Sequence, residues 1–504
     1  MKKNILDYFE EIVDKFGNNI AFEDQNNNIT YFELKRKAKI MGYIISNKYK
    51  KRNHPIVVHM EKKVFCLIAF LGVLYSGNCY VCLDKYMSVE RKKNICKRIN
   101  PMLIITDSDI DFYDNCDSVK YEKFNLDILP EELKKLDNVV DEIIEVDPAY
   151  ILFTSGSTGN PKGSVILHKS VISYAKWVIE KFEIDNNSIF GSQTPFYFSM
   201  SVLDIYATIF SGARLNIIPH MYFSFPIKLI EYLNEKKINV IYWVPSALSI
   251  VANWNTFDLK KPKYLNKILF AGEVMPVKQL NIWRKNLPDA LFANLFGPTE
   301  ITDIALYYIV DRDYTEKENL PIGIVADNMN AFVINEDGMC VDDGQEGELY
   351  FRGNYVGAGY YNDLENTQKY FVQNPLNKHY PEIVYKTGDL VKKKDGLYWY
   401  LGRKDNQIKH MGYRIELGEI ETAFNSCKEV DLAACIYIQE QDVLVVYYEG
   451  KIAYGDLKKY VEKYLPAYMI PTEVRKIKHI PLNRNGKIDR LQLTQLYYDE
   501  GVNI

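Results

Sequence analysis

Up to about residue 400, the chain alternates short apolar runs with segments of helical length and pattern. Ile56–His59 and Met102–Thr106 are apolar runs of strand length, and Lys237–Val244 leads into another. Val64–Tyr75 lies between the first two and is apolar over the length of a helix. Such alternation favours α/β layers with largely parallel sheets. We therefore predict a layered α/β fold for this part of the chain.

From Ile322 onward the pattern changes to strands punctuated by glycine, at Ala331–Ile334, Gly347–Gly353 and Gly396–Gly402. These short strands predict a small β-subdomain. A charged, polar joint, Gly402-Arg-Lys-Asp-Asn-Gln, follows them and precedes a new run of helix and strand patterns.

A length of 504 residues exceeds what one compact core supports, so we expect at least two domains. We predict a large N-terminal α/β domain with its β-subdomain over residues 1–402. A small C-terminal α+β domain is predicted over residues 403–504.

The stretch from Val64 to Leu83 is long and apolar enough to raise the question of a membrane span. Ser76-Gly77-Asn78 interrupts it with a turn signal, and Asp84-Lys85 follows it. A buried helix, a turn and a core strand are therefore predicted, and no membrane partner. The N-terminus leads directly into an amphipathic pattern without an apolar signal core, so we do not expect secretion.

A formal net charge of −4 gives no electrostatic reason to expect nucleic acid or an anionic membrane as a partner. The eight cysteines lack the dense spacing of a disulfide framework. Cys79 and Cys82 form a C-x-x-C pair in an alternating apolar run, without the further ligands of a zinc site. We predict that these are core residues in a reducing compartment, and that the protein is cytoplasmic.

The strongest local signal is Leu152-Phe-Thr-Ser-Gly-Ser-Thr-Gly-Asn-Pro-Lys-Gly163, where an apolar strand (Tyr150–Phe153) runs into a polar loop. Glycines let backbone N–H groups approach an anion, hydroxyls add donors, and Lys162 adds positive charge. We predict a polyphosphate ligand; a flexible surface loop is the alternative. The loop differs from the Walker A pattern, because Asn160-Pro161 separates Gly159 from the lysine.

Further motifs accompany this loop. They are Ile29-Thr-Tyr-Phe-Glu-Leu34, Asn294-Leu-Phe-Gly-Pro-Thr-Glu300, Gly347-Glu-Leu, Tyr385-Lys-Thr-Gly-Asp389, Tyr400-Leu-Gly-Arg403, Gly412-Tyr-Arg-Ile-Glu-Leu-Gly-Glu-Ile-Glu421 and Pro481-Leu-Asn-Arg-Asn-Gly-Lys487. With them, nearly the whole chain resembles the adenylate-forming superfamily. Within it, the resemblance is to stand-alone amino-acid adenylation enzymes such as the D-alanine–D-alanyl carrier protein ligases, and to adenylation domains of nonribosomal peptide synthetases.

The resemblance implies a site for ATP and Mg²⁺. The residues it assigns to ATP are Thr154, Ser155, Gly156, Ser157, Thr158, Gly159, Asn294, Leu295, Phe296, Gly297, Pro298, Thr299, Asp389, Tyr400, Arg403 and Lys487. It implies that Phe296 stacks on adenine where relatives usually have tyrosine, and that Asp389 accepts hydrogen bonds from the ribose hydroxyls. Glu300 is implied to bind Mg²⁺, a hard cation that favours oxygen ligands.

The resemblance also implies the catalytic steps, with Lys487, Lys162 and Glu300 as catalytic residues. Lys487 would bridge the substrate carboxylate and the α-phosphate, where two anions must be brought together. The acyl adenylate would then be attacked by a phosphopantetheine thiol. Between the steps, the mobile C-terminal domain would rotate about a hinge at Asp405 and exchange Lys487 for the segment Gly412–Glu421.

The acid-binding segment Thr194–Asp204 departs from the family pattern. Relatives carry an aspartate that pairs with the α-ammonium group of the substrate, and here that position is Ser199. A serine hydroxyl assisted by backbone carbonyls is the alternative. A carboxylate appears instead at Asp303, which we expect to lie away from Ser199 and to need a partner if buried. The positions implied to line the pocket are Phe198, Ser199, Met200, Leu203, Tyr242, Leu269, Ala271, Leu295, Asp303 and Ile304.

These features predict an ATP-dependent carboxylate–carrier protein ligase for a non-standard amino acid, such as a β-amino acid, or for a hydroxylated aryl acid. We expect the thiol acceptor to be a separate carrier protein, since only a short segment follows Lys487. A D-alanine–carrier protein ligase, an acyl-CoA synthetase and a catalytically idle nucleotide-binding module are the alternatives.

Overall fold

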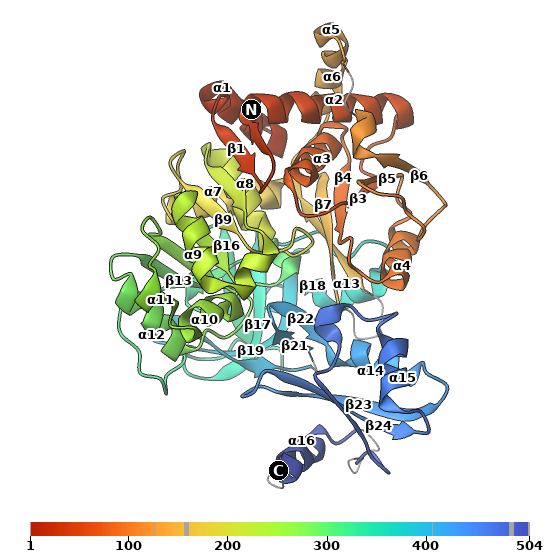
Figure 1. The fold of residues 1–504 in the computed structure, drawn as a ribbon, viewed down its shortest axis with the longest axis vertical. Coiled ribbons are helices and arrows are strands. Elements are labelled where there is room, and N and C mark those ends of the chain that lie inside the picture. The colour runs from red at the N-terminus through yellow and green to blue at the C-terminus, as the bar shows by residue number, and fades with distance from the viewer. Residues whose placement is uncertain (1, 125–126, 156–160, 406, 483–487, 502–504) are drawn as a thin grey trace. The chain divides into compact units, whose positions relative to one another are not determined.

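The computed structural model describes residues 2–124, 127–155, 161–405, 407–482 and 488–501 (Figure 1). The chain divides into two compact units. The first unit comprises Met1–Lys85, Ile99–Phe153 and Gly163–Lys404, and the second comprises Tyr86–Arg98, Thr154–Lys162 and Asp405–Ile504.

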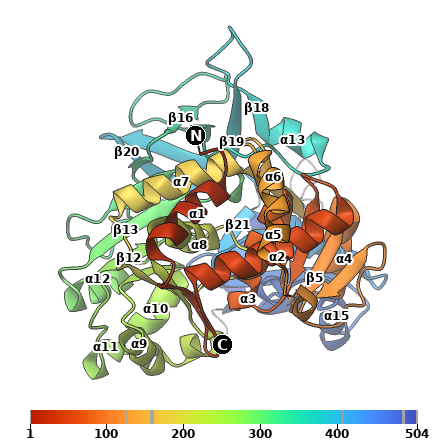
Figure 2. The same cartoon turned by 90° about the horizontal axis from the view of Figure 1, so that it is seen from above.

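The largest sheet of the first unit runs in the order β15-β14-β13-β12-β11-β9-β10-β1-β2. Its strands from β13 to β1 pair in parallel, while β14, β15 and β2 add antiparallel edges. Figure 2 shows α1, α7 and α8 on one face of this sheet and α9 to α12 on the other. The strands are β1 (Ile20–Glu23), β2 (Asn28–Thr30), β9 (Ile189–Ser192), β10 (Arg214–Ile217), β11 (Val240–Trp243), β12 (Lys267–Phe270), β13 (Leu291–Phe296), β14 (Leu306–Ile309) and β15 (Ile324–Val325). The helices are α1 (Ile5–Phe16), α7 (His168–Lys181), α8 (Ser201–Ser211), α9 (Pro226–Glu235), α10 (Pro245–Asn253), α11 (Thr256–Leu259) and α12 (Val277–Asn286), with the 3₁₀ turns η2 (His220–Ser224) and η3 (Thr299–Ile301).

A second sheet has the order β6-β5-β3-β4-β7-β8, and α3 packs against α2 beside it. Nearly every side chain of α3 is buried, as its uninterrupted apolar run requires. The predicted helix Val64–Tyr75, the turn after it and the strand that follows are confirmed. The elements are α2 (Tyr31–Tyr49), β3 (Pro55–His59), α3 (Val64–Tyr75), β4 (Cys79–Leu83), β5 (Leu103–Thr106), β6 (Asp117–Lys120), η1 (Tyr121–Phe124), α5 (Pro130–Leu133), α6 (Lys135–Asp141), β7 (Pro148–Thr154) and β8 (Lys162–Leu167).

The glycine-punctuated region forms a separate sheet in the order β16-β17-β19-β18, with β20 paired to β19. This sheet confirms the predicted β-subdomain. Its elements are β16 (Met329–Ile334), β17 (Glu346–Gly353), α13 (Leu364–Tyr370), β18 (Phe371–Gln373), β19 (Ile383–Lys394) and β20 (Leu397–Arg403).

The second unit is a small α+β body. Its sheet β23-β24-β25 carries α14 and α15 on one face and α16 on the other, and the β21–β22 hairpin precedes α14. In addition, Arg91 of α4 and Glu419 of α14 form a buried ion pair. The elements are α4 (Val89–Ile99), β21 (Gln407–His410), β22 (Tyr413–Glu416), α14 (Leu417–Asn425), β23 (Val430–Ile438), β24 (Val443–Gly450), α15 (Tyr454–Val461), η4 (Ala467–Met469), β25 (Glu473–Lys476) and α16 (Arg490–Gly501). Together the two units confirm the predicted fold class.

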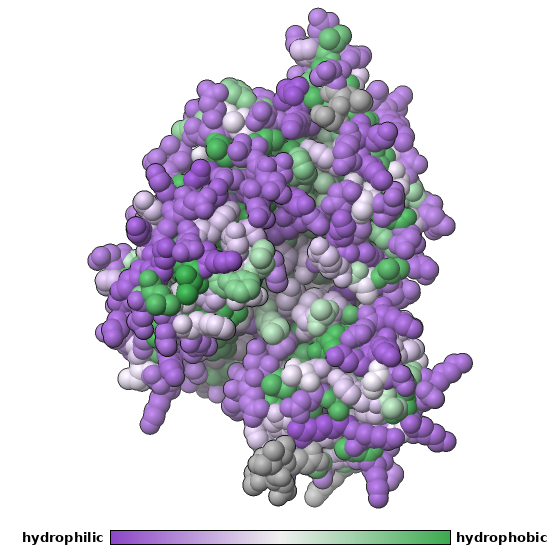
Figure 3. All heavy atoms as spheres, viewed as in Figure 1, coloured by the Kyte–Doolittle hydropathy of each residue, from purple (hydrophilic) through white to green (hydrophobic). Residues whose placement is uncertain are grey.

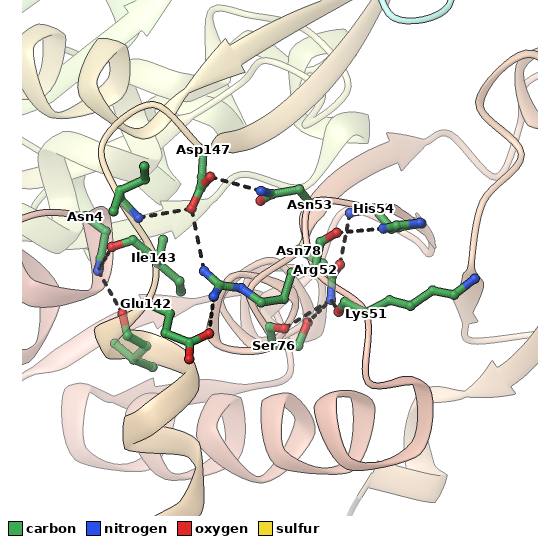
Figure 4. Close-up of polar contacts among 12 residues, drawn as sticks. Asn4, Lys51, Arg52, Asn53, His54, Ser76, Asn78, Glu142, Ile143 and Asp147 are labelled. Atoms are coloured by element: carbon green, nitrogen blue, oxygen red, sulfur yellow. Dashed lines mark hydrogen bonds and ion pairs between the residues drawn. The ribbon is translucent and has the colours of Figure 1, made fainter.

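Polar contacts join distant segments of the first unit around the end of α6 (Figure 4). Arg52 forms ion pairs with Glu142 and Asp147, and the Asn53 amide donates to Asp147 at 2.9 Å. Asn4 caps α1 and donates to the carbonyl of Ile143 at 3.3 Å. All these groups have protein partners, so this network is structural.

The large apolar side chains are mostly buried, and the face shown in Figure 3 is mainly hydrophilic. No helix in the described part of the chain is long and apolar enough to cross a membrane. Cys79 and Cys82 are buried thiols of β4, and burial raises the pKa of Cys79 to about 12. A thiol of that kind is unreactive, as predicted for core residues.

Candidate functional site

A buried ion pair in the β-subdomain joins two of the residues predicted to bind the nucleotide, and we call this region the nucleotide side. Asp389 and Arg403 face each other across β19 and β20, with Oδ1 and Nη1 2.7 Å apart and both side chains almost fully buried. The backbone N–H of Asp389 donates to Thr387 Oγ1 at 2.9 Å. A carboxylate fixed in this way can accept hydrogen bonds from paired hydroxyls such as those of a ribose.

Aromatic side chains lie beside the end of β13. The rings of Phe296 and Tyr400 are 5.8 Å apart between centroids and inclined at 44°. The amide of Asn294 donates to the carbonyl of Pro321 at 2.8 Å, which fixes the strand end. A Cβ atom at Gly297 would lie 2.1 Å from the carbonyl oxygen of Asp303, so only glycine allows this approach of two backbone segments.

Glu300, in the turn η3, is fully buried. Tyr360 donates its hydroxyl to Glu300 Oε1 at 2.6 Å, and the Glu300 carbonyl accepts from Gly357 at 2.9 Å. The described residues contain no group of three or more acidic, histidine or cysteine side chains that could hold a metal ion. Mg²⁺ usually takes one or two carboxylates and completes its shell with phosphate and water. Glu300 fits that requirement.

The predicted phosphate loop is described only at its ends. Gly156, Ser157, Thr158 and Gly159 lie outside the described residues, as does Lys487. The Thr154 hydroxyl is buried without a hydrogen-bond partner among the described residues. Within the second unit, Ser155 donates to the carbonyl of Arg414 at 2.6 Å, and Lys162 Nζ lies 3.9 Å from Glu416. An unsatisfied buried hydroxyl beside a glycine-rich loop fits an anionic ligand.

Among the residues predicted to line the acid pocket, which we call the acid side, Asp303 is a buried carboxylate. Tyr174 and Tyr242 donate their hydroxyls to Asp303 Oδ2 at 2.7 and 3.2 Å. Burial raises the pKa of the Asp303 carboxyl to about 7, against the effect of these hydroxyl donors. Asp303 therefore has the partners that its burial demands, although neither of these two donors carries a charge.

The backbone before Asp303 is strained. Thr302 has φ 76° and ψ −62°, and the N–H of Asp303 donates to the carbonyl of Ile301 at 3.0 Å. This is the rare, positive-φ form of the γ-turn, which is unfavourable for a β-branched residue. Such strain persists only where surrounding contacts enforce it. One such contact is made by the buried Thr302 hydroxyl, which donates to the backbone carbonyl of Tyr355 at 2.9 Å.

Ser199 is part of the same cluster, which corrects an expectation from the sequence. We expected Asp303 to lie away from Ser199, but the Ser199 hydroxyl hydrogen-bonds to the Asp303 carboxyl. Thr299 in turn donates to Ser199 Oγ at 3.2 Å. The expectation was wrong because the position of Asp303 depends on packing between segments far apart in the chain, which the sequence pattern does not reveal. The carboxyl group that is absent at position 199 is thus supplied next to it by Asp303, from a different part of the chain.

The apolar positions predicted for the pocket are almost all buried around this cluster. Tyr242 and Leu269 are register neighbours on β11 and β12. The buried apolar residues are Met200, Leu203, Leu269, Ala271, Leu295 and Ile304, while Phe198 is partly buried.

Sequence reasoning missed Tyr174 and Tyr360. Tyr174 lies on the buried face of α7 with Val171 and Val178, so its helical spacing predicts burial but no polar role. Tyr360 follows the glycines of Gly357-Ala-Gly359, and it belongs to none of the family motifs. Both reach their carboxylates only through long-range packing.

Most of the chain matches known protein families. The family model described as AMP-binding enzyme matches residues 9–361, and that described as AMP-binding enzyme C-terminal domain matches residues 419–487. A D-alanine–D-alanyl carrier protein ligase of Bacillus cytotoxicus is 30% identical over 501 residues, covering 97% of this chain and 98% of that protein.

Solved structures show the same fold. PA1221, an NRPS protein containing adenylation and PCP domains, has a TM-score of 0.83 at 21% identity, covering 98% of this chain and 84% of that one. The o-succinylbenzoate CoA synthetase of Bacillus subtilis has a TM-score of 0.84 at 17% identity, with 98% of both chains covered.

The chain therefore belongs to the AMP-binding enzyme family. It is an adenylate-forming ligase that uses ATP, in a fold of a large N-terminal and a small C-terminal domain.

Proposed function

We propose that this enzyme is an ATP-dependent carboxylate–carrier protein ligase. The observation that carries the proposal is the match over almost the full length of a carrier protein ligase, with 30% identity. The grouping of Asp389 with Arg403 and of Phe296 with Tyr400 supports the nucleotide part. A CoA synthetase has the same fold, so the fold alone does not determine whether the acceptor thiol belongs to CoA or to a carrier protein.

In the first step, a carboxylate oxygen of the acid attacks the α-phosphorus of ATP, and the bond to the leaving pyrophosphate breaks. Asp389, helped by Arg403 and Tyr400, would hold the ribose, and Phe296 would stack on the adenine; the contacts of Asp389 with Arg403 and of Phe296 with Tyr400 support this arrangement. When bound at Glu300, Mg²⁺ would supply charge neutralisation at the phosphates. Lys162 and Lys487 would stabilise the negative charge that develops on the phosphate oxygens.

In the second step, a phosphopantetheine thiol loses its proton and attacks the acyl carbonyl, and AMP leaves. The proposed domains, residues 1–402 and 403–504, would rotate about Asp405 between the steps. The division of the chain into two units between Lys404 and Asp405 supports a hinge there.

The acid we propose is a non-standard amino acid, such as a β-amino acid, or a hydroxylated aryl acid. Ser199 lacks the charge that relatives carry at this position, and Asp303, next to Ser199, offers a carboxyl from a different part of the chain. D-Alanine is the second candidate, because the full-length relative is a D-alanine–D-alanyl carrier protein ligase. The buried, free cysteines support a cytoplasmic location for either reaction.

Pyrophosphate exchange with a broad panel of acids tests adenylation. The panel should contain D- and L-alanine, β-amino acids and hydroxybenzoates. If none of these acids supports exchange, the remaining alternative is a catalytically idle nucleotide-binding module. Strong, selective exchange with alanine that does not change when Asp303 is replaced would establish a plain D-alanine ligase.

Intact-mass measurements test the acceptor. With ATP and an active acid, we expect a separately added carrier protein with its phosphopantetheine arm to gain the acyl mass. Stable acylation of the enzyme itself would contradict a separate acceptor. Formation of free acyl-CoA, with no carrier acylation, would establish an acyl-CoA synthetase.

A further inference from the structure

The polar cluster around Asp303 continues to a lysine outside every family motif. Lys62, just before α3, donates from Nζ to the backbone carbonyl of Ser192 at 3.1 Å. The same Nζ lies 5.3 Å from the centre of the Phe196 ring. Both contacts belong to the strand β9 and the acid-binding segment that follows it. The ammonium group is therefore held beneath the pocket, where burial lowers the pKa of Lys62 to about 7.

Asp204 of α8 is the acidic counterpart of Lys62. Its carboxyl is fully buried, and neither oxygen has a hydrogen bond of normal geometry within the described residues. Burial raises the pKa of Asp204 to about 7, and Lys62 opposes that rise through its charge. The two groups are not in direct contact, but each shifts the pKa of the other. An isolated buried carboxylate would be costly, and Lys62 is the cation that offsets it.

The charges of this cluster can be counted. Lys62 and Asp204 sum to zero whether the proton sits on the amine or on the carboxyl. Asp303 adds one negative charge when ionised, and it acts electrostatically on Asp204. Within the described part of the chain, the other titratable groups that act on these three residues are the thiol of Cys66 and the phenols of Tyr150, Tyr174 and Tyr242. Burial raises the pKa of each of these groups, so all stay neutral near pH 7.

Asp303 is also well supplied with neutral donors. Tyr174, Tyr242 and Ser199 all hydrogen-bond to its carboxyl. An ionised carboxylate has about four acceptor positions. A further hydroxyl adds one more neutral hydrogen bond, whereas a cation would also balance the buried charge.

We infer that Lys62 and Asp204 are positioning residues that form a neutral pair beneath the acid pocket. Among the described residues of this cluster, the pair leaves Asp303 as the unbalanced carboxylate, so that the pocket selects acids carrying an ammonium group. This inference rests on the proposed function and narrows it. It favours amino acids held by Asp303 over hydroxylated aryl acids.

The experiment compares acids of equal size that carry either an amine or a hydroxyl. Suitable pairs are alanine with lactate, β-alanine with 3-hydroxypropionate, and 3-aminobutanoate with 3-hydroxybutanoate. Pyrophosphate exchange gives kcat/KM for each acid, with ATP saturating. We expect the best amino acid to exceed its hydroxyl analogue by about a hundredfold or more. The KM of this amino acid should fall as pH rises through about 7, because Asp303 must lose its proton to pair the ammonium group.

Charge-balance variants separate this pairing from a purely structural role. Asp204→Asn leaves Lys62 without its partner, so we expect the preference for the amino acid to fall about tenfold. Adding Lys62→Met removes the excess cation and should return the preference toward that of the unaltered enzyme. The KM for ATP should stay unchanged in both variants. Lys63→Met is the matched control, because Lys63 pairs with Glu61 at the surface and should not alter the preference.

The outcomes are distinguishable. If no acid of any kind supports exchange, the proposed function fails and this inference fails with it. If acids are activated but hydroxyl analogues equal amino acids, only this inference is overturned. It is also overturned if the double variant loses more of the preference than Asp204→Asn alone. Should the variants not fold, the pH dependence of the unaltered enzyme decides: a KM for the amino acid that is flat from pH 6 to 8 contradicts a role for Asp303.

Discussion

The nucleotide side and the acid side of the first unit each bury a carboxylate, but they provide for its charge differently. On the nucleotide side, Asp389 lies 2.7 Å from the guanidinium of Arg403. On the acid side, Asp303 receives hydroxyl groups from Tyr174 and Tyr242, and its pKa rises to about 7. One carboxylate has a cation built into the fold, and the other has neutral donors.

The difference indicates what each side is prepared to bind. A carboxylate already paired with arginine is an oriented acceptor for neutral hydroxyls, which suits a ribose. A carboxylate with neutral donors gains most from a ligand that brings positive charge. The partners that the protein gives each carboxylate therefore indicate its ligand: neutral hydroxyl groups for Asp389 and a cation for Asp303.

The largest effect is expected from Lys487→Ala, because this change removes the proposed link between ATP and acid. We expect adenylate formation to fall by about a hundredfold to a thousandfold or more. Thioester formation from a supplied acyl adenylate should be spared, since Lys487 is proposed to act in the first step only. Exchange kinetics and single-turnover thiolation measure the two steps. An unchanged rate of adenylate formation would show that the assignment of this lysine is wrong.

A smaller effect, confined to the nucleotide side, is expected from Asp389→Asn. This change removes the carboxylate that pairs with the buried Arg403 guanidinium, which is also the charged acceptor proposed for the ribose. We expect KM for ATP to rise by about a hundredfold, while KM for the acid stays within about twofold. The melting temperature should also fall. Equal increases in both KM values would contradict the division into two sides.

Asp303→Ala should give the reverse pattern: use of the acid should be impaired, and binding of ATP should not. We expect kcat/KM for the preferred acid to fall by about tenfold to a hundredfold, since a charged hydrogen bond contributes roughly 1.5–3 kcal/mol. Analogues that lack the polar group should be nearly unaffected, and so should KM for ATP. A uniform loss for all acids would indicate general disruption of the pocket.

The sequence signals for the nucleotide side are local, whereas those for the acid side are not. Gly297, Glu300 and Asp389 lie in short contiguous motifs, whose local backbone geometry places their groups. The helix Val64–Tyr75 was predicted to the residue because a charged residue precedes its apolar run and a turn ends it. These are local signals, and sequence patterns encode them well.

The acid side depends on contacts between elements far apart in the chain. Lys62 precedes α3, Asp204 lies on α8, and Tyr174 lies on α7. The strained turn at Thr302 has no sequence signal, because a β-branched residue ordinarily disfavours positive φ.

The smallest effect is expected from Tyr174→Phe, which removes one neutral donor from Asp303 and leaves the ring in place. A single hydrogen bond contributes about 0.5–1.5 kcal/mol, so kcat/KM for the preferred acid should fall by about threefold to tenfold. The sign of the pH shift is the sharper readout. The Tyr174 hydroxyl lowers the pKa of Asp303, so its loss should raise that pKa and move the fall in KM for the acid to higher pH. Tyr355→Phe is the matched control. The Tyr355 hydroxyl donates to the backbone carbonyl of Asp327 and not to Asp303, and the Tyr355 ring packs against Tyr174. A pH profile that Tyr174→Phe leaves unmoved, measured beside this control, would show that Asp303 does not govern acid binding.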